Sequence, residues 1–273
     1  MKKTIVIIGA ETGIGFATAM SFFEQGHTVW VTAKDAEGVQ ILQENFPREC
    51  ILLVDLSKEG DIAEMITPLH NLASIDVLIC NAGVGTGGPT THIDIPALRE
   101  AFQINVFGHL EIIQRLLPKL ECGVDPRIIW TGSAAGYFVR PLFGGYASTK
   151  YAVTALCDAL RVELLGRVHV SLIAPGRIKT PIWEKGLLEV DKFQGRNDLK
   201  AYETAFDILA GEMKANSKES PNVRIVVKAM NHAVTSKRPK PYYRIGIDAF
   251  AAFWLKWLLP VRWVDWLLRK LCW

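Results

Sequence analysis

Short apolar runs alternate with longer amphipathic segments over residues 1–175. The runs are rich in Val and Ile and apolar throughout, which is typical of strands buried on both faces of a parallel sheet. We expect strands at Ile5–Ile8, Val29–Thr32, Ile51–Val54, Val77–Cys80, Ile128–Thr131 and Val170–Ala174. The longer segments have helical periodicity, as in Phe16–Gln25, Ile62–Leu72, Ala97–Leu120 and Tyr146–Leu165. This alternation predicts an α/β fold with helices on both faces of a mainly parallel sheet.

The rhythm changes after Pro175. Residues 182–220 are more charged and less regular, and we expect a lid or insertion there. A further helical segment follows at residues 223–235. We therefore expect one domain over residues 1–247, followed by a separate tail over residues 248–273.

The tail is rich in tryptophan and basic residues. Five of the chain's eight tryptophans lie in it: Trp254, Trp257, Trp263, Trp266 and Trp273. Lys256 and Pro260 interrupt its apolar run, which is too short to span a bilayer. The composition suits an amphipathic helix at a membrane interface, and we expect peripheral membrane contact. Covering a substrate entrance and packing against another subunit are the alternatives.

Three glycines separate the first expected strand from the first helix: Gly9, Gly13 and Gly15. Glycine permits a tight turn and lets the backbone approach a phosphate closely. The amides and the positive dipole end of the following helix would then point at that phosphate. A plain turn is the alternative, but the position between a strand and a helix favours a dinucleotide-binding loop.

Tyr146 precedes Lys150 by four residues in a segment of small and mostly apolar residues. Residues i and i+4 project from the same face of a helix. A fixed positive charge favours the phenolate and lowers the tyrosine pKa, which is ordinarily about 10. The pair is therefore a candidate proton donor and acceptor near neutral pH, although two ordinary helix residues would give the same spacing.

Further motifs follow in a fixed order: Asp55, Cys80-Asn81-Ala82-Gly83, Asn105, Ser133 and Pro175-Gly176. With the GxxxGxG loop and the Tyr146/Lys150 pair, this order resembles the short-chain dehydrogenase/reductase family over residues 1–181. The resemblance implies a Rossmann-type, doubly wound sheet of seven strands and an NAD(P)-dependent oxidoreductase acting on CH–OH groups. Two positions depart from the family pattern: Ile8 replaces the usual threonine, and Glu11 replaces a small polar residue.

The resemblance also implies a role for each catalytic candidate. Tyr146 is expected to exchange a proton with the substrate oxygen. Lys150, together with the positive nicotinamide ring, is expected to lower the Tyr146 pKa and to bind ribose hydroxyls. Ser133 would hydrogen-bond the substrate oxygen, and Asn105 would hold a water that links Lys150 to solvent. Taken singly, Ser133 also suits a strand-end turn, and Asn105 is a polar residue in an apolar run that needs a partner.

The same resemblance implies where the cofactor binds. The expected residues are Gly9, Thr12, Gly13, Ile14, Gly15, Lys34, Asp55, Leu56, Asn81, Ala82, Gly83, Tyr146, Lys150, Pro175, Gly176, Ile178 and Thr180. An acidic residue at the end of the second strand would favour NAD(H), but Ala33 stands there. Lys34 follows, where a basic residue can meet a 2′-phosphate. We expect NADP(H) to be preferred; NAD(H) is the alternative, because a shifted loop would bring in Asp35.

Apolar residues beside these motifs are candidates for a substrate pocket: Phe138, Leu142, Phe143 and Trp183. Such walls suit a hydrophobic ligand, and core packing is the competing explanation. Segments Thr180–Lys185 and Tyr242–Gly246 look similar to the retinol- and hydroxysteroid-dehydrogenase-like branch. That similarity implies a secondary alcohol, a ketone, or a retinoid- or steroid-like lipid, and a place in lipid metabolism.

The composition narrows the choice of partners and location. Hydrophobic residues make up 49% and charged residues 22% of the 273 residues, which is ordinary globular composition. A net charge of +3 does not suggest nucleic-acid binding. The cysteines and histidines show neither a disulfide framework nor metal-ligand spacing. We expect a cytoplasmic homo-oligomer that is peripheral on a membrane if its tail docks there.

Two non-enzymatic alternatives remain at this point. One is an NADP(H)-binding sensor, which would bind NADPH without consuming it. The other is a membrane-recruited scaffold, which would lose its role without the residues after Gly246 and keep it after a catalytic mutation.

Overall fold

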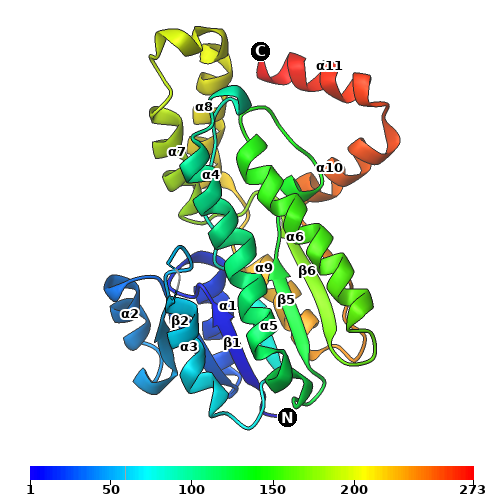
Figure 1. Ribbon diagram of the computed structural model, residues 1–273. Coiled ribbons are helices and arrows are strands. Elements are labelled where there is room, and N and C mark those ends of the chain that lie inside the picture. Colours follow the sequence, from blue (N-terminus) through cyan, green and yellow to red (C-terminus); the bar gives the residue numbers. More distant parts are fainter. Residues whose placement is uncertain (59) are drawn as a thin grey trace.

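The computed structural model describes residues 1–58 and 60–273. At its centre lies a sheet with the strand order β3-β2-β1-β4-β5-β6-β7, and every neighbouring pair is parallel (Figure 1). The strands are β1 Thr4–Ile8, β2 Thr28–Ala33, β3 Ile51–Leu53, β4 Val77–Cys80, β5 Arg127–Thr131, β6 His169–Pro175 and β7 Tyr242–Ile245. The order reverses between β1 and β4, which is where doubly wound sheets bind ligands. The predicted seven-stranded Rossmann-type sheet is confirmed.

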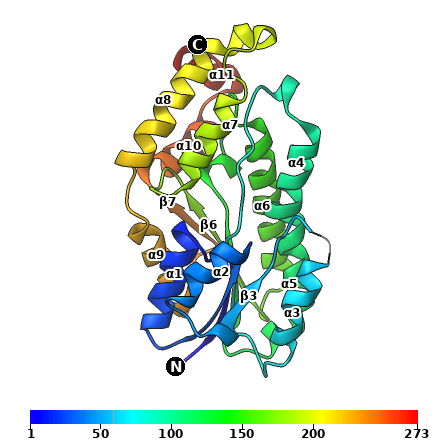
Figure 2. The ribbon, with the colours of Figure 1, turned by 90° about the vertical axis from the view of Figure 1, so that its left-hand side faces the viewer.

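Helices cover both faces of the sheet because successive strand residues point to opposite sides. In β1, Val6 and Ile8 belong to the core formed with α3, α5 and α6, whereas Ile5 and Ile7 belong to the core formed with α1, α2 and α9. Figure 2 shows α1 and α9 on one side of the sheet and α5 and α6 on the other. These helices are α1 Gly13–Glu24, α2 Ala36–Gln43, α3 Asp61–His70, α5 Gly108–Glu121, α6 Gly144–Glu163 and α9 Arg224–Thr235.

The helical segment expected at Ala97–Leu120 consists of three consecutive pieces. They are α4 (Ile95–Phe102), a π-helical turn (Gln103–Phe107) and α5. Single π-helical turns within α-helices are frequent at functional sites. This turn carries Asn105, whose side chain is fully buried.

The expected lid is more regular than its charged sequence suggests. It contains α7 (Ile182–Asp191) and α8 (Glu203–Glu219), joined through a 3₁₀ segment at Asn197–Tyr202. Together they bury a small apolar cluster of their own, in which the rings of Phe193 and Phe206 stack with centroids 5.9 Å apart. The apolar positions of α8 have helical spacing, and their charged neighbours hide that spacing in the sequence.

The tail folds as two helices, α10 (Ile247–Leu258) and α11 (Val261–Cys272). The Phe253 ring of α10 packs under the Arg244 guanidinium, 3.8 Å from the ring centroid. The chain then turns back, so that the C-terminus lies beside α8 (Figure 1). There the indole nitrogen of Trp273 donates to the carbonyl of Ala201 at 3.3 Å. None of the helices in the described chain is long and apolar enough to cross a membrane.

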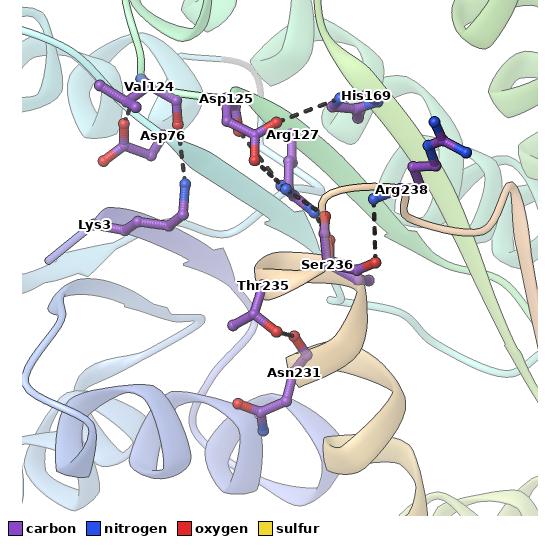
Figure 3. A network of polar contacts seen from close by, with 11 residues as sticks. Lys3, Asp76, Val124, Asp125, Arg127, His169, Asn231, Thr235, Ser236 and Arg238 are labelled. Carbon is purple, nitrogen blue, oxygen red and sulfur yellow. Dashed lines mark hydrogen bonds and ion pairs between the residues drawn. The ribbon is translucent and has the colours of Figure 1, made fainter. Parts of the chain in front are cut away.

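A buried arginine connects the amino-terminal end of the sheet to the end of α9 (Figure 3). Arg127 opens β5 and is only 1% exposed. Its guanidinium donates to the carbonyls of Ala233 and Ser236 at the end of α9, and it pairs with the Asp125 carboxylate. The last carbonyls of a helix lack partners within the helix, so a cation there satisfies them and complements the helix dipole.

Candidate active site

A cavity of about 660 Å³ opens at the carboxyl end of the sheet. Ile8 at the end of β1, Thr131 at the end of β5 and Pro175 at the end of β6 contribute to its wall. The lid closes the far side with residues of α7 and α8. One continuous space therefore contains both the expected cofactor positions and the expected substrate positions, and its volume is ordinary for a small-molecule site.

The glycine loop forms a cradle that larger residues would fill. Gly9 has φ +80°, and a Cβ there would lie 2.6 Å from the Cα of Ala82. At Gly15 a Cβ would lie 1.9 Å from the Gly9 carbonyl oxygen. The Thr12 side chain makes no capping bond to the first turn of α1. The amides of that turn are therefore left for a phosphate group, as a dinucleotide requires.

Asn81 braces the glycine loop against the neighbouring strands. Its Nδ2 donates to the Gly9 carbonyl at 2.8 Å, and its Oδ1 accepts from the Thr131 hydroxyl at 3.2 Å. The backbone amide of Ala82 donates to the Ile8 carbonyl at 2.8 Å. The ends of β1, β4 and β5 are thereby held in fixed relation around the floor of the cavity.

Tyr146 and Ser133 meet at one wall of the cavity. Burial raises the pKa of the Tyr146 phenol, and the neighbouring Ser133 hydroxyl partly offsets that increase. The Ser133 oxygen also accepts from the amide of Ala135 at 3.1 Å. Because the pKa of Tyr146 lies above its usual value of 10.0, the phenol is protonated at neutral pH and can donate to an oxygen placed beside it.

Lys150 lies behind Tyr146 on the same face of α6. It is 4% exposed, and its Nζ donates to the Thr131 carbonyl at 3.1 Å. Burial lowers the pKa of its amine to about 8. Nζ is 5.7 Å from the centroid of the Tyr146 ring, yet burial dominates the phenol's pKa. The expected net lowering of the Tyr146 pKa is therefore not seen with the protein groups alone.

Asn105 uses its whole side chain to hold other parts of the site. Its Oδ1 accepts from the Val84 amide at 2.8 Å. Its Nδ2 donates to the Val84 carbonyl at 2.9 Å and to the Thr149 hydroxyl at 3.0 Å. The amide thus joins the loop after β4 to α6, one residue before Lys150. These partners explain the buried polar residue, and the expected water relay stays a prediction.

The two ends of the cavity differ in chemistry. At one end, Lys34 and Asp55 contribute to the wall beside the glycine loop, and Asp55 accepts from the Ser57 hydroxyl at 2.7 Å. At the other end the wall is mostly apolar and includes the four expected pocket residues: Phe138, Leu142, Phe143 and Trp183. The Trp183 indole donates to the Ile178 carbonyl at 2.6 Å, which fixes its ring.

The structure gathers nearly all the expected site residues around this cavity. Gly15 and Asn105 do not line it but lie behind its wall, where they position the loop and α6. Sequence reasoning named Trp183 from the lid but missed other wall residues, among them the Arg140–Glu212 ion pair and Asp248 of the tail. The Asp248 carboxylate accepts from the Arg177 amide at 2.6 Å. A Cβ at Gly176 would lie 2.2 Å from the Oδ1 atom of Asp248. The glycine of the Pro175-Gly176 motif was therefore the one local signal of this contact.

The fold and the site together define an α/β oxidoreductase that uses a nicotinamide dinucleotide. A family model described as short chain dehydrogenase matches residues 3–189. The chain belongs to the short-chain dehydrogenase/reductase family and is an NAD(P)-dependent alcohol/carbonyl oxidoreductase.

Individual relatives extend the likeness over nearly the whole chain. An NADPH-dependent 3-dehydrocapnine reductase of Ornithobacterium rhinotracheale is 30% identical over 95% of this chain and 94% of its own length. Human 17-beta-hydroxysteroid dehydrogenase type 1 is 29% identical over 89% of this chain and 77% of its own length. The fold is similar to that of a short-chain dehydrogenase/reductase from Burkholderia phymatum in complex with NAD, with a TM-score of 0.75, 22% identity, and coverage of 97% and 95% of the two chains.

Proposed function

We propose that the protein is an NADP(H)-preferring oxidoreductase that interconverts a hydrophobic secondary or lipid-like alcohol and its carbonyl. The observation that carries this proposal is one cavity with a glycine cradle at one end and an apolar wall at the other. The Tyr146 phenol and the Ser133 hydroxyl lie between them. The proposed site residues are those expected from the sequence, together with Asp248 and the Arg140–Glu212 pair.

In the proposed reaction, the chain's own residues handle the proton and the developing charge. The bound nicotinamide supplies or accepts the hydride. Tyr146 donates its phenolic proton to the carbonyl oxygen in reduction and takes the alcohol proton in oxidation. Ser133 hydrogen-bonds the same oxygen and stabilises negative charge on it. Lys150 acts behind Tyr146 to bind the ribose, and its charge stabilises the phenolate that remains after proton transfer.

Cofactor preference is argued from the end of β2. Ala33 offers no acceptor for a ribose hydroxyl, and the exposed Lys34 contributes to the same wall. A lysine there suits a 2′-phosphate. The relative from Ornithobacterium, described as NADPH-dependent, supports the same preference; NAD(H) is the alternative.

The substrate class is argued from the apolar end of the cavity. Phe138, Leu142 and Trp183 contribute to that wall, and the stacked rings of Phe193 and Phe206 continue it into the lid. The relative described as a 17-beta-hydroxysteroid dehydrogenase supports a steroid-like substrate. We therefore propose a steroid-, retinoid- or similar lipid-like substrate.

Turnover in detergent tests the proposal. Purified protein is offered NADPH or NADH with steroid ketones, retinal and long-chain ketones, beside Tyr146→Phe. We expect NADPH oxidation that the variant lowers by at least about 100-fold, the lower range for general acid–base catalysis. Tight NADPH binding without turnover in either direction would instead favour a sensor, and turnover that survives Tyr146→Phe would overturn the assigned role.

We also propose that the tail, residues 248–273, is a unit distinct from the domain at 1–247 and contacts an anionic phospholipid surface. Trp257, Trp263 and Trp266 are each more than half exposed. Four exposed basic residues accompany them: Lys256, Arg262, Arg269 and Lys270. Tryptophan and basic residues together suit an anionic interface.

Vesicle sedimentation tests the tail. We expect the protein to bind phosphatidylglycerol-containing vesicles and to lose binding when the three exposed tryptophans are replaced by alanine. Equal recovery of both proteins with the vesicles would contradict the proposal. Family membership also supports a homo-oligomer, which analytical ultracentrifugation would test. If the tail forms the interface between subunits, the variant with the three tryptophans replaced by alanine would lose the oligomer.

A further inference from the structure

Glu11 is the one acidic residue of the glycine loop, and it faces the cofactor end of the cavity. It is half-buried, and its Oε2 oxygen is enclosed without a hydrogen-bond partner among the described residues. A buried acceptor without a partner costs free energy. The position therefore has an unsatisfied acceptor on a residue that contributes to the wall where the dinucleotide is proposed to lie.

The packing around Glu11 places it beside the end of β2. A Cβ added at Gly38, in the first turn of α2, would lie 2.9 Å from the Cβ of Ala33 and 3.2 Å from the Cβ of Glu11. Glu11 and Ala33 thus pack against the same glycine. Glu11 therefore places a carboxylate beside Ala33, where the end of β2 carries none.

Charged groups from three elements surround the Glu11 carboxyl. A bond from its own backbone amide, Lys185 of α7 and Lys34 after β2 lower its pKa, while Asp35, the N-cap of α2, raises it. Asp35 is already engaged, because its carboxylate accepts from the Gly38 amide at 2.9 Å. Burial is the largest influence and raises the pKa of Glu11 above 4.5.

We propose that Glu11 and Lys34 are opposed specificity determinants for the adenosine ribose of the cofactor. Glu11 accepts a hydrogen bond from a 2′-hydroxyl and so favours NAD(H), whereas Lys34 pairs with a 2′-phosphate and favours NADP(H). This inference rests on the proposed cofactor site. It adds an acidic determinant on the glycine loop.

The preference between NADP⁺ and NAD⁺ should depend on pH, because Glu11 can gain or lose its charge. An ionised Glu11 repels a 2′-phosphate, and a protonated Glu11 donates a hydrogen bond to it. As pH falls through the pKa of the Glu11 carboxyl, NADP⁺ binding therefore strengthens relative to NAD⁺ binding. The 2′-phosphate itself titrates near pH 6, so the Glu11 contribution must be isolated by comparison with a variant that keeps the phosphate and removes the carboxyl.

Binding of NADP⁺ and NAD⁺, measured by calorimetry between pH 5.5 and 8 without substrate, tests the proposal. At pH 7.5, Glu11→Gln is expected to raise the NADP⁺-to-NAD⁺ affinity ratio by roughly 10-fold, and Lys34→Gln to lower it by a similar factor, which is the lower range for one hydrogen bond to a charged group. Glu11→Gln should also flatten the part of the pH profile that the phosphate does not account for. The control is Glu37→Gln, an identical change at an exposed residue of α2 that does not line the cavity.

The outcomes separate this inference from the proposed function. If both dinucleotides bind and Glu11→Gln changes their affinity ratio no more than Glu37→Gln does, the inference is overturned and the proposed function stands. If the unaltered protein binds neither dinucleotide, the proposed cofactor site fails and the inference fails with it.

Discussion

Replacing Arg127 by methionine removes a buried cation and the hydrogen bonds it donates. The side chain is 1% exposed, and the guanidinium donates to two carbonyls at the end of α9 and pairs with Asp125. Hydrogen bonds to charged groups contribute about 1.5–3 kcal/mol each. Methionine has similar length and fills part of the space, but it leaves the Ala233 and Ser236 carbonyls without a donor. The Asp125 side chain is 42% exposed and can be hydrated, so the cost comes from the two carbonyls. An unsatisfied buried acceptor costs about 1–3 kcal/mol, and we expect Arg127→Met to lower the free energy of unfolding by about 2–6 kcal/mol.

Urea unfolding followed by far-UV circular dichroism measures this loss. In a separate thermal melt, the Tm should fall by roughly 10 °C, at about 2–4 °C per kcal/mol for a protein of this size. Arg167→Met is the matched control, because Arg167 forms an exposed pair with Glu121 at 2.6 Å and its side chain is 55% exposed. Such pairs contribute about 0–1 kcal/mol. If the two variants lose the same stability, the argument from burial is wrong.

Three further changes test other parts of the structure. Gly15→Ala should abolish measurable dinucleotide binding in a fluorescence titration while the fold persists by circular dichroism, because its Cβ would lie 1.9 Å from the Gly9 carbonyl oxygen. Lys150→Met should abolish turnover yet unfold at higher urea concentration at pH 7, since burial lowers the folded-state pKa of that amine from 10.5 to about 8. The stability of the unaltered protein should accordingly rise relative to Lys150→Met between pH 8 and 10.5, where the unfolded lysine binds more protons than the folded one. Deleting Trp273 should increase proteolytic cleavage within the lid, and unchanged cleavage would show that its contact with Ala201 does not hold the lid.

Local patterns were enough to predict six of the seven strands, whereas β7 was expected only from the resemblance to the family. The apolar runs at β1 and β4 are continuous because helices cover both faces, so each strand is visible without knowledge of its partners. The short helix α2 was not predicted, because its eight residues offer barely two turns of periodicity. The lid was expected to be irregular, because the apolar positions of α8 are scattered among charged residues and their partners lie in α7.

The site shows the same division between local and long-range information. The order of the motifs was enough to propose Tyr146, Lys150 and Ser133, which the fold brings to one cavity, because each follows a recognisable strand or lies on one helix face. The pKa of Tyr146 could not be read in the same way, since the sequence shows the neighbouring lysine but not the burial that raises the value. Asp248 was placed in the tail by its position in the chain, and only the fold brings its carboxylate to the amide of Arg177.

The tail is therefore connected to the site at both of its ends. Asp248 opens α10 and lines the cavity beside Gly176, and Trp273 at the C-terminus contacts the lid at Ala201. Between these two contacts lie the exposed tryptophans of α10 and α11. A membrane that binds those tryptophans would therefore contact a segment whose first turn lines the cavity and whose last residue contacts the lid. Membrane docking and covering of the substrate entrance, which the sequence presented as alternatives, are thus compatible in this fold.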